Sequence, residues 1–335
     1  MNISVKESME SREKIQTQSS VALDARISDS IKRVCENISL ALLGKPEVVQ
    51  FSMVALLAEG HLLVEDVPGI GKTLLARAIA KSISCTFNRI QFTPDLLPSD
   101  LLGISVYQQN TGAFVFQPGP IFSQIILADE INRASPRTQS ALLEAMSDRQ
   151  VSIDGNTRKL GPPFFVLATQ NPREFEGTYP LPESQMDRFM IRLSVGYPDR
   201  IFERKILLGH RDGEPVENLK PVLTQEELIE IQALVYKVAV DDRIADYLLD
   251  LIESTRTHPD ILLGASTRAA LGLYRAAQSM ALIKGRGFVI PDDIKILSKP
   301  VLAHRIMPRS AGGSGAIRVA EQILGDILER LNVPE

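Results

Sequence analysis

The sequence has few of the residues that hold small secreted or metal-centred domains together. It contains only two cysteines, Cys35 and Cys85, and no tryptophan in 335 residues. Neither cysteine belongs to a Cys-x-x-Cys pair or a cysteine–histidine cluster, so no disulfide framework and no zinc site are predicted. Hydrophobic residues make up 44% of the chain, which is enough for a sizeable core without either. The sparse cysteines are typical of a reducing compartment.

The chain also lacks a large charge excess and a long apolar run. Lysine and arginine total 37 against 41 aspartates and glutamates, a net charge of -4 that argues against a protein coating nucleic acid non-specifically. The longest uncharged stretch, residues 101–128, is interrupted by glycines, prolines and amides, so no membrane span is predicted. The N-terminus has no apolar core of a signal peptide, and we expect a cytoplasmic protein.

Hydrophobic periodicity divides the chain into three parts. Residues 1–22 are polar, and we expect a flexible N-terminal segment. Residues 23–198 alternate short apolar strands with helices, which predicts an α/β domain whose parallel sheet is sandwiched by helices. Two predicted hairpins interrupt it, turning near residues 110–112 and 154–155. Residues 199–335 show helical patterns, opened by a capping box at Thr224 and Glu227, and predict an all-α domain.

The first chemical signal is a glycine-containing turn between a predicted strand and a predicted helix. Its residues are Pro68, Gly69, Ile70, Gly71, Lys72, Thr73 and Leu74. Glycines allow backbone N–H groups to face an anion at the helix N-terminus. Lys72 would then reach the β- and γ-phosphates, and Thr73 would ligate magnesium. Asp66 stands where the full phosphate-loop pattern has glycine, so a simple strand-to-helix turn is the alternative.

The second signal is a pair of acids at the end of an apolar strand. Asp129 and Glu130 follow four apolar residues, 125–128, and ligands bind at the carboxyl edge of open α/β sheets. We expect Asp129 to hold magnesium through its water shell, and Glu130 to orient or deprotonate the attacking water. Two solvated acids at a strand end are the alternative.

Three further residues are candidates for contact with nucleotide. Asn171 ends another apolar strand, where its amide can reach the γ-phosphate or the water. Arg188 is a candidate arginine finger, acting on the nucleotide of a neighbouring subunit. Arg268 lies in the first turn of a helix capped by Ser266, where a cation opposes the helix dipole and so suggests a phosphate partner. The alternatives are an Asn-Pro turn, a surface pair of Asp187 with Arg188, and a solvated arginine.

Together these segments resemble the AAA+ ATPases, and more narrowly the MoxR family. The resemblance covers roughly residues 31–310. Its most specific stretches are residues 92–101, 127–134, 138–146 and 167–172, together with 264–266 and Arg268. Family members often have proline where Thr267 stands, and they are not strict at the position of Asp66.

The resemblance implies an AAA+ P-loop core with hairpin inserts, followed by a helical lid. It implies ATP and Mg²⁺ as cofactors, and homo-hexameric rings with nucleotide between subunits. It places Asn171 at sensor 1, Arg268 at sensor 2 and Arg188 at the finger position, and the hairpins resemble inserts that face the pore. Such proteins are chaperone-like machines that remodel or mature client protein complexes, often with a partner carrying a von Willebrand factor A domain.

Two other functions stay open at this point. A nucleic-acid-dependent AAA+ motor is the first, although only Arg158 and Lys159 supply positive charge on the hairpins. A GTPase-like switch is the second, although the chain has no Asn-Lys-x-Asp motif for reading guanine. Arg133 and Arg137 flank the loop after Glu130, and either could contact a neighbouring subunit or remain solvated.

Overall fold

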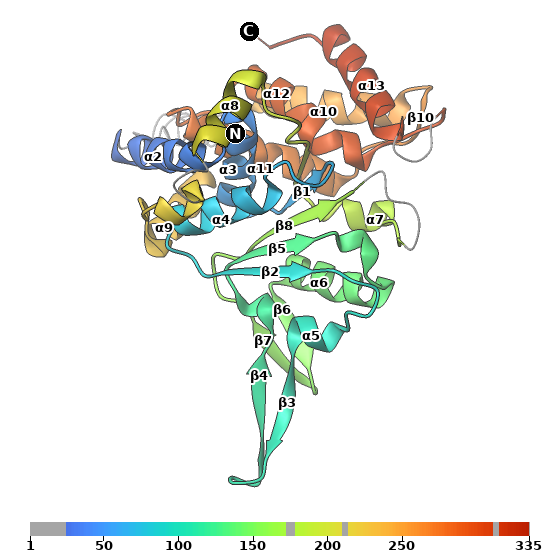
Figure 1. Ribbon diagram of the computed structural model, residues 1–335. Coiled ribbons are helices and arrows are strands. Elements are labelled where there is room, and N and C mark those ends of the chain that lie inside the picture. Colours follow the sequence, from blue (N-terminus) through green and yellow to red (C-terminus); the bar gives the residue numbers. More distant parts are fainter. Residues whose placement is uncertain (1–24, 172–177, 210–213, 311–314, 335) are drawn as a thin grey trace, which may run out of the picture.

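The computed structural model describes residues 25–171, 178–209, 214–310 and 315–334. The predicted flexible segment, residues 1–22, lies outside them. Figure 1 shows a central sheet with helices on both faces, a hairpin projecting away from it, and a group of helices at the opposite end. Within the described ranges, no helix is long and apolar enough to span a bilayer.

Five parallel strands form the central sheet. They are β1 (Leu62–Glu65), β2 (Phe87–Gln91), β5 (Ile125–Asp129), β8 (Phe165–Gln170) and β9 (Ile191–Leu193), in the order β2–β5–β8–β1–β9. Each coincides with a predicted strand. β1, β5 and β8 are largely apolar because they are buried on both faces, whereas the edge strand β2 buries only Ile90. Since β8 pairs in parallel with both β1 and β5, the ends of these three strands meet at one edge of the sheet.

Successive residues of each strand enter different layers of the core. In β5, Ile125 and Leu127 belong to the same cluster as the buried residues of three helices, whereas Ile126 and Ala128 belong to a second cluster. The first layer contains α2 (Ala25–Ala41), α3 (Pro46–Leu57) and α4 (Lys72–Ser82). The second contains α5 (Pro98–Leu102) and α6 (Pro136–Asp148). The predicted sandwich of a parallel sheet between helices is confirmed.

Both predicted hairpins are present as antiparallel pairs. They are β3 (Gly103–Gln108) with β4 (Ala113–Pro118), and β6 (Gln150–Ile153) with β7 (Asn156–Lys159). The second turns at Asp154 and Gly155, which both have positive φ. The Arg158 guanidinium lies 3.9 Å from the centre of the Phe116 ring. This cation–π contact joins the two hairpins.

The C-terminal part is helical with one small exception. Its helices are α8 (Arg200–Gly209), α9 (Gln225–Val235), α10 (Asp242–Thr257), α11 (Thr267–Ile283), α12 (Pro291–Leu302) and α13 (Ala316–Arg330). The capping box of Thr224 and Glu227 opens α9 as predicted. The exception is an antiparallel pair, β10 (Ile261–Leu263) with β11 (Met307–Pro308), whose strands are too short for their alternation to be recognised in a sequence.

Shorter elements complete the described chain. The helix α7 (Glu183–Met186) precedes β9. The short 3₁₀ helices are η1 (Pro120–Phe122), η2 (Ile131–Arg133), η4 (Pro215–Asn218) and η5 (Ala303–Arg305). Lid side chains bond the end of α3. Gln232 donates to the Leu56 carbonyl oxygen at 2.8 Å, and Ser279 donates to that of Val54 at 3.0 Å. Each of these carbonyl oxygens also accepts a backbone N–H, from Glu59 or Ala58, so the side chains add bonds between the C-terminal helices and α3.

A buried histidine, His61, lies just before β1 and bonds two neighbouring elements. His61 Nδ1 accepts the Val166 N–H of β8 at 3.1 Å, and Nε2 lies 3.1 Å from the Met146 carbonyl oxygen of α6. The first contact requires an unprotonated Nδ1, so Nε2 carries the proton. Complete burial, with a smaller effect of the Arg149 charge, lowers the pKa of His61 from 6.5 to about 4.

This histidine should make the fold less stable in mild acid. The unfolded chain binds a proton at His61 near pH 6.5 but the folded chain does so only near pH 4, so stability falls as the pH drops between these values. We expect His61 alone to contribute a loss of about 2 kcal/mol between pH 8 and pH 5. Urea unfolding at both pH values measures it.

The matched variants are His61→Gln and His258→Gln. In His61→Gln, the loss of stability between pH 8 and pH 5 should be smaller by about 2 kcal/mol. The loss that remains includes the contribution of the buried His304, whose pKa is also lowered well below its usual value. His258→Gln, near the surface, should keep the wild-type slope. An unchanged slope in His61→Gln would contradict the assignment.

Candidate nucleotide-binding site

The glycine turn connects β1 to α4 with the backbone geometry that anion binding requires. Gly69 and Gly71 have φ values of +82° and +95°, a region that side chains disfavour. Gly71 is the N-cap residue of α4, so the unpaired N–H groups of the first helical turn follow it directly. No other atom lies within 4 Å of a Cβ built on Gly69. The turn therefore leaves open space in front of a helix N-terminus, as a phosphate site needs.

Lys72 and Thr73 begin α4 at this turn. Lys72 is 9% exposed, and its Nζ donates to the Asp66 carbonyl oxygen at 2.7 Å. This bond bends the ammonium group back over the loop instead of into solvent. Thr73 is partly exposed in the same first turn. Both side chains therefore lie where the sequence pattern predicts contact with phosphate and metal.

Asp66 explains why the imperfect phosphate-loop pattern still gives this geometry. Asp66 does not have a positive φ, so its backbone conformation does not require glycine. Its carboxylate accepts hydrogen bonds from the Val67 N–H at 2.8 Å, the Ser194 hydroxyl at 2.6 Å and the Gly196 N–H at 2.7 Å. Partial burial opposes the charge, but these three donors outweigh it and lower the pKa of Asp66. Asp66 thus ties the loop to the chain leaving β9.

The two acids leave β5 at the same edge of the sheet. Asp129 is 9% exposed, and its Oδ1 accepts the Thr169 hydroxyl of β8 at 2.6 Å. The Thr169 hydroxyl oxygen in turn accepts the Glu130 N–H at 2.8 Å. Glu130 has φ 57° and ψ 50°, a left-handed conformation that is uncommon for a residue with a side chain. Such strain is typical of functional positions and needs support from its surroundings.

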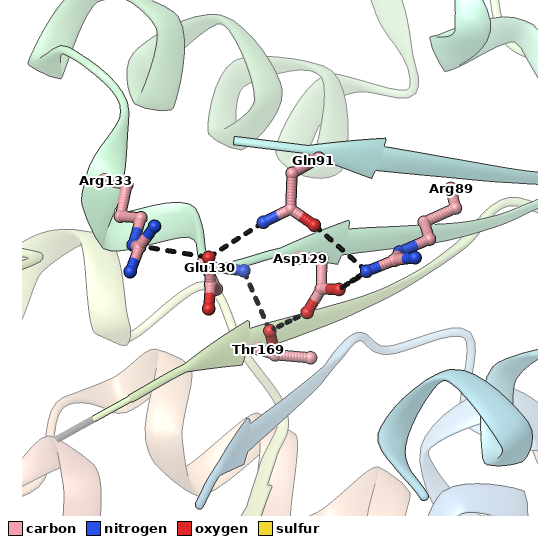
Figure 2. A network of polar contacts seen from close by, with 6 residues as sticks. All are labelled: Arg89, Gln91, Asp129, Glu130, Arg133 and Thr169. Carbon is pink, nitrogen blue, oxygen red and sulfur yellow. Dashed lines mark hydrogen bonds and ion pairs between the residues drawn. The ribbon is translucent and has the colours of Figure 1, made fainter. Parts of the chain in front are cut away.

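Figure 2 shows the side chains that surround these acids. Arg89 of β2 donates to Asp129 Oδ2 from Nε at 3.1 Å and from Nη2 at 2.6 Å. Gln91, two residues further along β2, accepts from Arg89 Nη2 at 3.0 Å and donates to Glu130 Oε2 at 2.8 Å. Arg133 Nε lies 3.3 Å from the same Glu130 oxygen. Each carboxylate therefore faces one arginine, and Gln91 links the two pairs.

The donor chemistry fits a magnesium ion that is bound mainly by nucleotide. The described residues contain no group of three or more histidine, cysteine, aspartate or glutamate side chains able to hold a metal alone. Thr73 and Asp129 supply oxygen atoms, which Mg²⁺ prefers, and protein sites for it commonly use one or two carboxylates with phosphates and water.

Asn171 lies at the same edge, directly after β8. It is 6% exposed, and β8 runs between β1 with its phosphate loop and β5 with its acids. The fold therefore brings Lys72, Thr73, Asp129, Glu130 and Asn171 to neighbouring strand ends.

Arg188 follows α7, and its side chain is bonded within its own chain. Its guanidinium donates to the Leu143 carbonyl oxygen and, at 2.7 Å, to the Ser147 hydroxyl, both near the end of α6. Nε of Arg188 is buried without a hydrogen-bond partner among the described residues. Asp187 does not form the simple surface pair with Arg188 considered above; its Oδ1 lies 3.3 Å from Arg305 Nε.

Arg268 lies on the lid, in the first turn of α11. Ser266 caps this helix by accepting the Ala269 N–H at 3.0 Å, as predicted, and donates to Asp187 Oδ2 at 3.3 Å. Burial, together with the charge of Arg268, lowers the pKa of Arg305 to about 10 although Asp187 opposes this. The charge of Arg268 is thus felt at the junction of lid and core.

The sequence predicted no role for Arg89 or Gln91, and Thr169 entered only as part of the stretch 167–172. A signal was present, because two polar residues at alternate positions of β2 point to one face of an apolar sheet. Arg133 contacts Glu130 within the same chain, whereas Arg137 is an exposed residue of α6.

Comparisons with known proteins agree with this geometry. Residues 61–191 match the model of the ATPase family associated with various cellular activities (AAA), and residues 253–327 match the AAA lid domain. The chain is 49% identical to the uncharacterized protein YeaC of Bacillus subtilis over 302 residues, covering 90% of this chain and 94% of that protein.

Two further relatives cover most of the chain. One is the chaperone MoxR1 of Mycobacterium tuberculosis, 40% identical over 287 residues, 83% of this chain and 76% of that protein. The other is a crystal structure from Cytophaga hutchinsonii, assigned as an ATPase, with a TM-score of 0.84, 36% identity, and coverage of 97% of this chain and 99% of that one. The identity with MoxR1 over most of the chain, together with the AAA and lid matches, shows that the chain belongs to the MoxR family of AAA+ ATPases.

Proposed function

We propose that this chain is a Mg²⁺-dependent ATPase that hydrolyses ATP to ADP and phosphate in order to remodel client proteins. The supporting observation is that the phosphate loop and the acid pair lie at one sheet edge, where Thr169 of the intervening strand bonds both acids. We further propose that it works in the cytoplasm as a homo-hexameric ring with nucleotide between subunits.

The residues of this chain would divide the work as follows. Backbone N–H groups of the glycine turn and Lys72 bind the phosphates, with Lys72 leaving the Asp66 carbonyl oxygen to do so. Glu130 orients the attacking water and accepts its proton, and its position depends on Gln91 and Thr169. Thr73 and Asp129 would hold Mg²⁺, which when bound neutralises phosphate charge. Asn171 and Arg268 are the proposed contacts for the γ-phosphate.

The projecting hairpin favours protein clients. Beside its polar turn it exposes two aromatic rings, with Phe114 72% and Tyr107 53% accessible and their ring centres 5.3 Å apart. The cation of Arg158, on the second hairpin, stacks on Phe116, so it contributes to the contact between hairpins. Exposed aromatic side chains with little free positive charge suit a protein segment better than a phosphate backbone. The relative MoxR1 is named a chaperone, and a partner with a von Willebrand factor A domain is part of this proposal.

The first test separates nucleotide binding from turnover. Glu130→Gln keeps the size of the side chain but removes the base, so ATP binding should persist while turnover falls by roughly 10²–10⁴-fold. Binding is measured by calorimetry and turnover by phosphate release. Glu144→Gln, on the exposed side of α6, is the matched control and should keep wild-type turnover. Normal turnover in Glu130→Gln would overturn the catalytic assignment.

The second test concerns Arg188 and assembly. If subunits complete each other's sites, activity per subunit should rise with protein concentration. Mixing Arg188→Ala subunits, which keep Glu130, with Glu130→Gln subunits, which keep Arg188, should then restore activity that neither variant has alone, because an arginine finger contributes roughly 10³–10⁵-fold to turnover.

The bonds of Arg188 to α6 provide the contrasting outcome. If Arg188 serves only to hold Leu143 and Ser147 within its own chain, Arg188→Ala should unfold at a lower temperature, and the mixture should be no more active than the two variants alone. Thermal unfolding of Arg188→Ala beside the mixing experiment distinguishes the two. A mixture that recovers no activity would contradict the trans role.

A further inference from the structure

The contact between Arg89 and Asp129 has no place in the functions proposed so far. Asp129 is the carboxylate expected to face magnesium, yet both of its oxygens are engaged by protein. Oδ1 accepts the Thr169 hydroxyl, and Oδ2 accepts two N–H groups of Arg89. The Asp129 side chain is only 12% exposed with Arg89 in this position. Little of its oxygen surface is left for a hydrated divalent cation.

We propose that Arg89 is the resident counter-cation of Asp129, which neutralises this carboxylate while no metal–nucleotide complex is bound and must withdraw before a divalent cation can face it. The proposal rests on the nucleotide site proposed above. It assigns to Arg89 a positioning role that sets how much magnesium the site requires.

Charge balance is the first argument for this role. Asp129 and Glu130 are consecutive, and two neighbouring carboxylates repel each other. Arg89 and Arg133 face them one to one, at 2.6 Å and 3.3 Å. The four side chains are therefore neutral together without any metal. A divalent cation beside Asp129 would give this group a net positive charge, which withdrawal of Arg89 reduces and phosphate arriving with the metal offsets.

Orientation is the second argument. Gln91 accepts from Arg89 Nη2 at 3.0 Å, which aims the guanidinium at Asp129, and donates to Glu130 from its other atom. Figure 2 shows Arg89, Gln91 and both acids in one continuous network. Withdrawal of Arg89 therefore also removes one bond of the glutamine that holds the proposed base.

Freedom to withdraw is the third argument. β2 is the edge strand of the sheet, and the Arg89 side chain is 50% exposed. Its ion pair is therefore partly screened by water and is weak enough to be exchanged. A fully buried arginine could not leave without a large desolvation cost.

The test compares nucleotide affinity with and without magnesium. The probe is AMP-PNP, a non-hydrolysable ATP analogue, titrated by calorimetry in EDTA and at increasing Mg²⁺ concentrations. In EDTA, Arg89→Ala should bind the analogue roughly threefold or more weakly than wild type, because two uncompensated carboxylates repel phosphate. With magnesium the order should reverse, and the half-maximal Mg²⁺ concentration should fall by roughly threefold to tenfold, the range for breaking a half-exposed ion pair.

Matched variants identify the cause. Arg89→Lys keeps the charge and should keep near wild-type affinity in EDTA. Arg330→Ala, at the exposed end of α13, removes one arginine far from the sheet edge and should change neither curve. Because Arg89 is half exposed, folding should survive, and Arg89→Gln repeats the test if Arg89→Ala unfolds.

The outcomes are distinguishable. Opposite shifts in EDTA and in magnesium support the counter-cation role. Weaker binding of Arg89→Ala under both conditions would mean that Arg89 contacts nucleotide directly, and unchanged binding under both would make it a spectator; either overturns the inference. Absence of binding by wild type in magnesium would instead overturn the proposed function, and this inference with it.

Discussion

Two carboxylates leave the end of one buried strand side by side, and the rest of the site depends on how their charge is balanced. A strand that is apolar on both faces delivers Asp129 and Glu130 to one edge of the sheet, where two neighbouring carboxylates repel each other. Thr169 donates to one and accepts from the backbone of the other, and two arginines neutralise the pair. The left-handed backbone at Glu130 is tolerated because Thr169, Gln91 and Arg133 hold the residue in place.

The order of strands then explains how phosphate chemistry reaches these acids. β8 lies between β1 and β5, so the phosphate loop and the acid pair are one strand apart, and Thr169 and Asn171 occupy the interval. Because these strands are parallel, the residues that follow them all lie at the same edge of the sheet, even where their side chains do not touch. Loop geometry is set separately, by Gly69 and Gly71 and by the three hydrogen bonds to Asp66.

Sequence reasoning could predict the elements and the edge at which the site lies. All five sheet strands were predicted, although β2 is largely polar, and the glycine turn and acid pair were recognisable because their chemistry depends on consecutive residues. Contacts that join distant segments were not predictable in the same way. Arg89 and Asp129 are brought together by the pairing of β2 with β5, a register that no local pattern specifies. The partners of Asp66, Asp187 and Arg188 likewise come from other elements, so only the alternatives for these residues could be stated.

The junction of lid and core adds a constraint on how the lid can move. Arg305 has a side chain only 3% exposed, and it donates to the carbonyl oxygens of Asp187 and Phe189 beside its ion pair with Asp187. Separating this arginine from its partners would leave a buried charge uncompensated, which is costly. Ser266 joins the same aspartate, and Arg268 follows it by two residues on the surface of α11. α11 is also bonded to α3 through Ser279, so this helix is held to the core at both places. A phosphate that attracted Arg268 would therefore act beside one of these two contacts.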